Sequence, residues 1–376
     1  MDKRKIVISS NTSWFIYNFH RELASVMQSQ GYQVVVVAPR DDYSKKLEKL
    51  DIEFYDIGIS NKGTHPIEDI KLFFRFYKLY RSISPDLILH YTIKPNIYGT
   101  MAAGVLTVPT ISTIAGLGTV FLNNKLSSHI ARLLYKVALR IPKRVFFLNS
   151  YDRKLFLDSN IVKVEKTGLI PGSGIDTEKF KPVNIDRNPQ APICFLLIAR
   201  LIKDKGVVEF VQAAEKIRAK YPDSTGLKFC IIGEYYHGNP TSITEKEMQH
   251  WVEEGYVDYL GTSDDIRPII AKADCIVLPS YREGISQVLL EAASMGKALI
   301  ATDVPGCKEV IDDGVNGLLC HLKDADSLAK QIIKMSNLSD EERDEMGRRG
   351  REKVISQFEE KIVNDAYMRA VSAILS

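Results

Sequence analysis

The stretch from Cys275 to Asp303, CIVLPSYREGISQVLLEAASMGKALIATD, carries the pattern that decides the fold. The apolar runs CIVLPS and ALIATD are typical of strands that are buried on both faces, and the segment between them has the pattern of a helix. Strand, helix and strand in this order indicate a parallel βαβ unit. Glu291 is unexpected there, because it places a carboxylate among small and apolar helix residues.

The same alternation extends over most of the chain. Before residue 171 the strand-like runs are KIVIS, VVVVAP, FYDIG, LILHY, TISTIA and RVFFLN. The Pro- and Gly-rich segment PGSGIDTEKFKP interrupts the rhythm, which resumes with ICFLLIAR, LKFCIIG, VDYLG, CIVLPS, ALIATD and GLLC. The pattern predicts an α/β fold of two doubly wound, Rossmann-like domains, covering 1–173 and 174–357. The last helical segment, about 358–376, is expected to return to the first domain.

The composition is that of an ordinary globular chain, with 376 residues and 45% hydrophobic content. An odd count of five cysteines without a C-x-x-C pair favours a reducing compartment over disulfides or structural zinc. The uncharged stretch 95–124 is long enough to span a membrane, but it contains a proline and several glycines. We interpret it as a helix over 96–106, a buried strand over 110–115 and a glycine turn.

Positive charge is concentrated in the first half. Residues 1–182 carry 26 Lys and Arg against 16 Asp and Glu, whereas the remainder carries 24 against 31. Two basic segments, 70–83 and 125–144, interleave these cations with large apolar residues. One face of each must pack on the sheet, but the pattern also favours an anionic membrane surface as a partner. Nucleic acid is the weaker alternative, because no recognition motif accompanies the charge.

Charged side chains follow two strands of the second domain. ICFLLIAR ends in Arg200, Lys205 comes shortly after, and CIVLPS leads to Glu283. Glu291 lies in the second turn of the next helix and can reach back toward the helix N-terminus. Ligands of parallel sheets gather at this edge, so the set suits the diphosphate and hydroxyl groups of a nucleotide sugar. The alternatives are solvated loop cations and an exposed helix position for Glu291.

Four motifs carry a resemblance to a known family: ARLIKDKG, GIDTEKFKP, PSYREGISQVLLEAASMGKALIATDVPG and DDGVNGLL. They resemble the signatures of family-4 glycosyltransferases, which are retaining enzymes of GT-B fold. The resemblance covers both domains and includes two glutamates separated by seven residues. It implies a hexosyltransferase with a UDP-sugar as co-substrate, with no metal and no further cofactor.

The resemblance also implies roles for individual residues. Glu291 would bind the ribose hydroxyls, and Glu283 would contact the transferred sugar. Arg200 and Lys205 would hold the diphosphate, and these two cations and Glu283 form the expected catalytic set. The remaining donor contacts would come from backbone amides beside Glu283 and from a loop near the base: Gly284, Ile285, Ser286, Thr262 and Ser263.

The first domain departs from the commoner family pattern. The loop after the first strand reads SSNTSWF, and Ala115 stands where many members have a histidine. With HYTIKPNIYG, these loops resemble the N-acetylgalactosaminyltransferase-like subgroup that extends undecaprenyl-diphosphate-linked saccharides, at the inner face of the bacterial cell membrane. The implied acceptor-binding residues are Asn11, Lys94, Gly116 and Gly118. For His90 we favour a structural role.

The resemblance therefore implies a retaining transferase that moves a hexose or N-acetylhexosamine from a UDP-sugar to a polyprenyl-diphosphate-linked saccharide in surface polysaccharide biosynthesis. It would be cytoplasmic and peripheral on the membrane. The alternative is a nucleotide-sugar epimerase of similar fold. A dehydrogenase is disfavoured because no G-x-G-x-x-G follows the first strand. The DAD at 324–326 resembles a metal motif but stands at a helix start, where Asp is a common cap.

Overall fold

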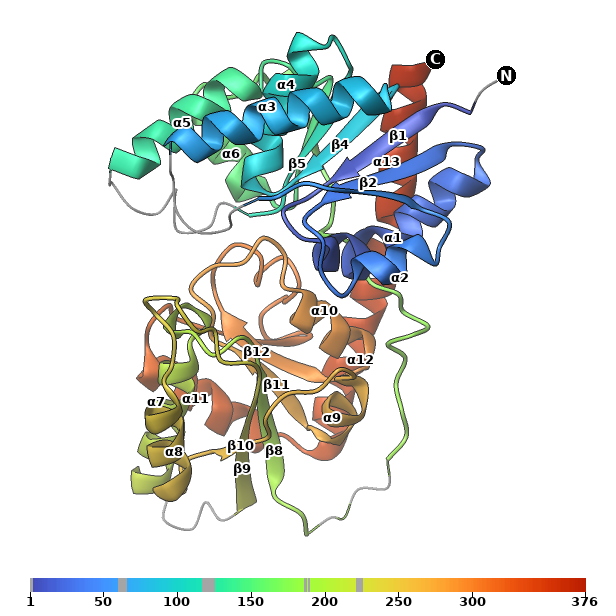
Figure 1. The fold of residues 1–376 in the computed structure, drawn as a ribbon. Helices are drawn as coiled ribbons and strands as arrows, with labels where there is room; N and C mark the ends of the chain where they lie inside the picture. Colours follow the sequence, from blue (N-terminus) through green and yellow to red (C-terminus); the bar gives the residue numbers. More distant parts are fainter. Residues whose placement is uncertain (1–2, 60–65, 117–125, 186–187, 189, 221–225) are drawn as a thin grey trace. The chain divides into compact units, whose positions relative to one another are not determined.

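The computed structural model describes residues 3–59, 66–116, 126–185, 188, 190–220 and 226–376 (Figure 1). The chain forms two compact units, Met1–Gly174 with Glu360–Ser376, and Ile175–Glu359. Each unit contains a parallel sheet with helices on both faces. This arrangement confirms the predicted pair of doubly wound α/β domains.

The first unit contains a seven-stranded sheet in the order β3-β2-β1-β4-β5-β6-β7. Alternate residues of its first strand face opposite layers of helices: Ile6 and Ile8 pack on one side of the sheet and Val7 on the other. The strands are β1 (Lys5–Ser9), β2 (Gln33–Ala38), β3 (Glu53–Asp56), β4 (Leu87–Tyr91), β5 (Thr110–Ile114), β6 (Arg144–Phe147) and β7 (Thr167–Leu169).

The helices of this unit alternate with its strands, except for the last one. They are α1 (Ser13–Ser29), α2 (Ser44–Glu48), α3 (Pro66–Ile83), a π-helical turn (Pro95–Gly99), α4 (Thr100–Val105), α5 (Leu126–Ala138), α6 (Ser150–Asp158), a 3₁₀ turn (Val164–Lys166) and α13 (Glu360–Leu375). Helix α13 packs beside α1 on one face of the sheet, through Val363, Tyr367 and Val371.

The second unit contains a six-stranded sheet in the order β10-β9-β8-β11-β12-β13. Helices α7, α8 and α11 cover one face, and α9, α10 and α12 cover the other. The strands are β8 (Ile193–Ile198), β9 (Leu227–Ile232), β10 (Asp258–Tyr259), β11 (Cys275–Leu278), β12 (Ala298–Thr302) and β13 (Gly317–Cys320). The helices are α7 (Val207–Lys220), α8 (Glu245–Glu253), α9 (Arg267–Lys272), α10 (Gln287–Ser294), α11 (Ala325–Ser336) and α12 (Asp340–Gln357), with a 3₁₀ turn at Lys203–Lys205.

The uncharged stretch that begins at residue 95 forms the predicted helix and strand. The π-helical turn and α4 together cover most of 96–106, and β5 is completely buried. Within the described parts of the chain, none of the helices combines the length and the apolar character that a membrane span requires.

Both sheets reverse their direction of growth at a pair of neighbouring strands. In the first unit these strands are β1 and β4, and in the second they are β8 and β11. The loops that follow such a pair diverge and leave a crevice at the carboxyl edge, where α/β proteins bind their ligands. The predicted donor residues Lys205 and Glu283 follow β8 and β11, so they lie at this edge.

Candidate functional site

The loop after β8 packs closely against the loop after β11. The turn Lys203–Lys205 ends at Gly206, which has a φ of +74°, and a Cβ there would lie 2.1 Å from the Pro279 oxygen. The Tyr281 N–H donates to the Asp204 oxygen at 2.8 Å. Because only glycine fits this contact, the sequence KDKG fixes the position of Lys205 relative to the second loop.

Lys205 and Glu283 form the central ion pair of this edge. The Lys205 Nζ lies 2.5 Å from a Glu283 carboxylate oxygen, and the two side chains are only 19% and 13% exposed. The Glu283 N–H donates to the Pro305 oxygen at 3.2 Å. Gly306 has a φ of +87°, and a Cβ at this position would lie 2.5 Å from the Glu283 carbonyl carbon. The loop at 305–306 therefore acts as a backbone cradle for Glu283.

Ser286 caps α10, which begins at Gln287 as predicted. Its hydroxyl accepts a hydrogen bond from the Leu289 N–H at 3.4 Å. We expected a free N–H at Ser286, but this expectation is wrong, because the group donates to the Gly306 oxygen at 2.9 Å. Gly284 and Ile285 are half-buried in the same loop. Their contacts with a donor, and that of Ser286, stay predictions.

The environment of the Glu291 carboxyl group changes its pKa. Burial raises its pKa to about 7, whereas the Lys179 ammonium and a hydrogen bond with Gln287 oppose the rise. The rise follows because a desolvated carboxylate is disfavoured relative to its protonated form. Glu291 is half-buried, so it does not occupy a simple exposed helix position. Perturbed carboxyl groups of this kind are common at functional sites.

Arg200 and the loop after β10 are more exposed. The Arg200 guanidinium lies over the ring of Tyr236, with its central carbon 5.0 Å from the ring centre. Thr262 and Ser263 lie in an exposed loop, where the Ser263 hydroxyl donates to the Asp265 oxygen at 2.8 Å. These three predicted donor residues are thus accessible, whereas Lys205 and Glu283 are largely buried and contact each other directly.

The predicted acceptor residues lie at the carboxyl edge of the first unit. The Asn11 N–H donates to the Thr92 hydroxyl at 3.2 Å, which links the loops after β1 and β4. Lys94 pairs with Asp69 at 3.0 Å, and their side chains are 17% and 9% exposed. Asp69 thus neutralises much of the positive charge of Lys94, which was predicted to contact an acceptor phosphate. Gly116 follows β5 with a φ of +141°, and Gly118 lies outside the described residues.

His90 has the predicted structural environment. It is completely buried, and its ring nitrogens lie 3.0 Å from the Tyr80 hydroxyl and 3.1 Å from the Thr100 hydroxyl. Burial lowers its pKa to about 3, so the ring is neutral at physiological pH. A Cβ at Gly99 would lie 2.7 Å from the imidazole, which explains the glycine there.

The DAD at 324–326 has the predicted role at a helix start. Asp324 caps α11 by accepting the Ser327 N–H at 2.8 Å, and Asp326 pairs with Lys216 at 2.8 Å. Among the residues that the structure describes, no group of three or more His, Cys, Asp or Glu side chains is arranged to hold a metal.

Sequence reasoning missed three contributors to these edges. Gly306 supports Glu283, Tyr236 supports Arg200, and Asp69 neutralises Lys94. The glycine gave a usable signal, because it closes the VPG turn directly after a buried strand. The other two contacts join residues that are distant in sequence, so no local pattern could indicate them.

Comparison with known proteins identifies the class. Residues 192–337 match the family described as glycosyl transferases group 1, and residues 5–149 match glycosyl transferase 4-like. The chain belongs to these glycosyltransferases and has the GT-B fold. It is 27% identical, over 99% of both chains, to the N,N'-diacetylbacillosaminyl-diphospho-undecaprenol alpha-1,3-N-acetylgalactosaminyltransferase of Campylobacter jejuni.

Two further matches extend the comparison. The UDP-Gal:alpha-D-GlcNAc-diphosphoundecaprenol alpha-1,3-galactosyltransferase of Escherichia coli is 26% identical, over 78% of this chain and 76% of its own. The structure of Anabaena HepE, solved in complex with UDP and glucose, has a TM-score of 0.78 at 18% identity and covers 99% of this chain and 100% of its own. The family resemblance predicted from the four motifs is therefore confirmed.

Proposed function

We propose that this glycosyltransferase moves a hexose or N-acetylhexosamine from a UDP-sugar to a polyprenyl-diphosphate-linked saccharide, with retention at the anomeric carbon. The observation that carries the proposal is the desolvated Lys205–Glu283 pair, which lies at the same carboxyl edge as α10. The printed names of the two bacterial relatives support the acceptor class, and that of the Escherichia coli relative supports the donor class. They also disfavour the epimerase alternative.

Lys205 can serve the donor diphosphate without releasing Glu283. An ammonium group has three N–H donors, and the Glu283 contact accounts for one of them. The other donors can meet the phosphate oxygens. Arg200 would leave the face of Tyr236 to add a second cation. Both cations would then stabilise the charge that develops on the departing UDP.

Glu283 is better suited to orient the sugar than to attack it. Its carboxylate is already held by Lys205, and its backbone is fixed by Gly306. A double displacement would require this carboxylate as a nucleophile within reach of the anomeric carbon. We therefore infer front-face attack, in which the departing phosphate oxygen accepts the acceptor proton. In this scheme no side-chain base is required.

Product analysis tests the proposed reaction. The full-length protein is incubated with a panel of UDP-sugars and polyprenyl-diphosphate saccharides, and mass spectrometry identifies the productive pair. NMR of the first product gives the anomer, which is expected to match that of the donor. An inverted anomer would contradict retention, and an adduct of sugar on Glu283 would contradict front-face attack alone.

We further propose that the first unit binds the membrane surface peripherally. Helix α3 exposes Ile67, Ile70 and Phe74, and α5 exposes Ile130, Leu133 and Val137. In each helix the three residues are spaced to share one face, which is typical of helices that lie in a membrane interface.

An acidic residue within α3 reduces the positive charge of that helix. Glu68 lies 2.8 Å from Lys71 and 3.6 Å from Arg75, whereas α5 contains no acidic residue. Flotation with anionic and neutral vesicles tests the interface. Recovery with anionic vesicles should be higher and should fall as salt rises. Equal recovery with both lipids would contradict the proposal.

A further inference from the structure

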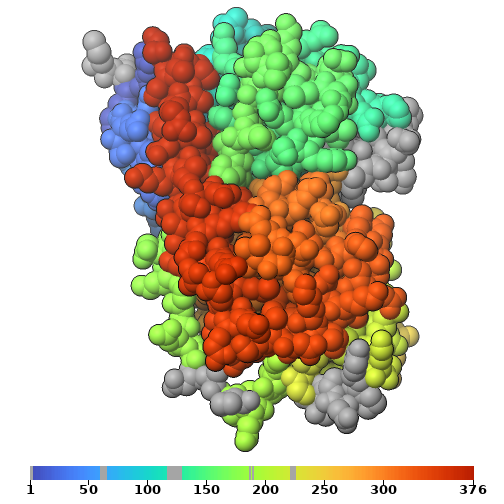
Figure 2. Space-filling model, turned by 180° about the vertical axis from the view of Figure 1, so that it is seen from behind, coloured from blue at the N-terminus to red at the C-terminus, as the bar shows by residue number. Residues whose placement is uncertain are grey.

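A basic hollow lies at the edge of the first unit, between the edge strands and α13. Its volume is about 680 Å³, within the range of small-molecule sites. In Figure 2, α13 (red) lies at the surface of the first unit beside the green segment, which the colour bar places around residue 150. Lys143, Arg144, Phe146, Gly168 and Leu169 line one side, and Ala366, Arg369, Ala370, Ala373 and Ile374 line the other.

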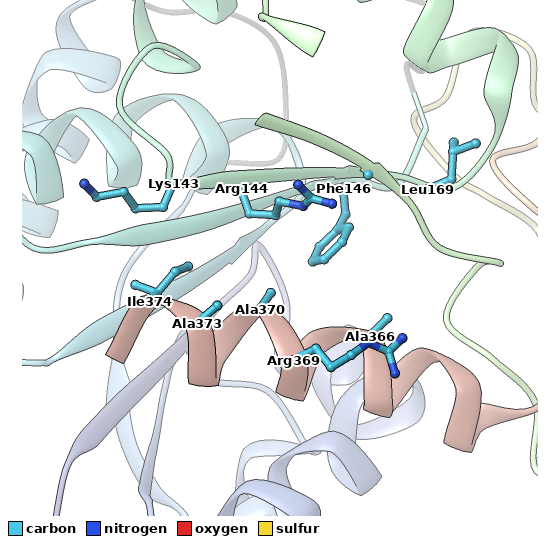
Figure 3. A pocket seen from close by; sticks show the side chains of 10 residues that line it. Lys143, Arg144, Phe146, Leu169, Ala366, Arg369, Ala370, Ala373 and Ile374 are labelled. Atoms are coloured by element: carbon cyan, nitrogen blue, oxygen red, sulfur yellow. The ribbon is translucent and has the colours of Figure 1, made fainter. Parts of the chain in front are cut away.

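The hollow exists because small residues stand where larger ones would fill it. Three alanines of α13 face β6 and β7, at positions 366, 370 and 373 (Figure 3). On the strand side, a Cβ at Gly168 would lie 2.9 Å from the Phe146 ring and 3.1 Å from an Arg144 nitrogen. The glycine therefore leaves both side chains in place at the rim.

The lining carries three cations and no acidic residue. Within the described part of the chain, the Lys143 and Arg369 side chains have neither an ion pair nor a hydrogen bond. Arg144 donates to the Glu165 backbone oxygen at 3.5 Å and lies over the Phe146 ring, 5.7 Å from its centre. Such a concentration of unneutralised charge favours an anion.

The pKa of a neighbouring lysine, Lys166, is affected by the same positive charges. Burial lowers the pKa of Lys166, and the charges of Lys143 and Lys163 lower it further. The carboxylate of Glu165 opposes this effect, but it acts less strongly than either lysine. The region around the hollow therefore carries an excess of cations.

Apolar atoms complete the lining. Phe146 presents its ring toward α13, and Leu169 and Ile374 lie at the two ends of the hollow (Figure 3). Leu169, the last residue of the edge strand β7, is 48% exposed. Cations beside a hollow with an apolar lining match a ligand that is charged at one end and apolar at the other.

We propose that this hollow binds the phosphate headgroup of an anionic membrane lipid. Arg144 and Arg369 would contact the phosphate, and Lys143 would add positive charge at the other end of the hollow (Figure 3). The first carbons of the acyl chains would lie against Ala373 and Ile374. Arg144 and Lys143 stand at the amino end of β6, whereas the predicted acceptor residues follow the carboxyl ends of β1, β4 and β5. The site is thus separate from the predicted acceptor site of the same unit.

Short-chain lipids test the proposal with the full-length protein. Dihexanoyl-phosphatidylglycerol, kept below its micelle concentration, is titrated by calorimetry, and hydrogen exchange locates the binding. Dihexanoyl-phosphatidylcholine tests the need for net negative charge, and glycerol phosphate tests the need for chains. We expect the anionic lipid to bind more tightly than either, with protection of the peptides that contain β6, β7 and the end of α13.

Variants connect binding to the lining. Arg369→Gln should weaken binding of the anionic lipid about tenfold, as expected for the loss of one charge-assisted hydrogen bond. Lys361→Gln, an equal change of charge on an exposed residue of the same helix, should have no effect. Ala373→Leu fills the hollow without changing its charge. It should weaken binding of the lipid more than binding of glycerol phosphate.

Three outcomes would overturn the inference. The first is equal binding of the anionic lipid by Arg369→Gln and the unchanged protein. The second is the absence of detectable binding or of protection at α13. The third is glycerol phosphate binding as tight as that of the lipid, which would assign the hollow to soluble phosphate esters instead.

Discussion

The carboxyl edges of the two sheets differ in how their cations are held. In the second unit, Lys205 pairs with Glu283, a residue that is itself predicted to contact the donor. In the first unit, Lys94 pairs with Asp69, which has no predicted role in binding. Both pairs are largely buried, but only the pair in the second unit joins two loops that follow the switch-point strands.

This difference teaches where charge can serve a ligand. Lys205 and Glu283 are fixed by backbone contacts of Gly206 and Gly306, so their geometry is set before a donor arrives. Preorganised charge of this kind stabilises a transition state effectively. Lys94 would have to share its charge between Asp69 and an acceptor phosphate. We therefore expect substitutions at the donor edge to have larger effects than those at the acceptor edge.

The largest effect should follow removal of a donor-edge cation. Lys205→Ala should lower kcat by about 100- to 1,000-fold, as expected for loss of a group that stabilises developing charge. Arg200→Ala should act in the same direction, but less strongly, because Arg200 is exposed and stacked on Tyr236. Steady-state kinetics with the productive donor measures both. If neither kcat nor KM changes, the phosphate site lies elsewhere.

Displacement of Glu283 should have the next largest effect. Gly306→Ala would place a Cβ 2.5 Å from the Glu283 backbone, so we expect about a tenfold to hundredfold loss of kcat/KM. Gly314→Ala is the matched control, because its φ of +75° imposes similar strain but no atom lies within 4 Å of the added Cβ. Both variants should lose about 1 kcal/mol of stability from the positive φ alone. Equal activity of the Gly306→Ala and Gly314→Ala variants would contradict the proposed role of Gly306 in positioning Glu283.

The smallest effect is expected at the acceptor edge. Lys94→Gln alone would leave Asp69 buried without its cation, so the informative variant is the double change Lys94→Gln with Asp69→Asn. We expect this variant to raise the acceptor KM about threefold to tenfold, with the donor KM unchanged. Kinetics at varied acceptor concentration measures it. A loss as large as that of Lys205→Ala would remove the proposed difference between the edges.

Local patterns of the sequence predicted the donor edge better than the acceptor edge. The alternation of strand and helix predicted both sheets, and the start of α10 followed from Ser286 and the apolar run after it. The pairing of Lys94 with Asp69 could not be read, because it joins α3 to the loop after β4. The amide of Ser286 was likewise unpredictable, because its acceptor lies in the loop that follows another strand.

Glu291 also connects stability with pH. Its pKa is about 7 in the folded chain and near 4.5 for an unburied glutamate, so folding is opposed above pH 7 by its ionisation. That cost disappears as the pH falls toward the unfolded value. Glu291→Gln should therefore stabilise the protein above neutral pH by on the order of 2 kcal/mol, and by less near pH 5. Thermal unfolding of both proteins at the two pH values measures this. An equal difference in stability between the two proteins at both pH values would contradict the raised pKa of Glu291.

The affinity for a UDP-sugar as a function of pH tests the central claim most directly. If the ionised Glu291 accepts hydrogen bonds from the ribose hydroxyls, calorimetry should show about a tenfold loss of affinity between roughly pH 8 and pH 6, because a carboxyl with a pKa of about 7 becomes protonated. Glu291→Gln should bind about tenfold to a hundredfold more weakly at pH 8, with no dependence on pH in this range. An affinity that is independent of pH in the unchanged protein and equal in the variant would contradict the account.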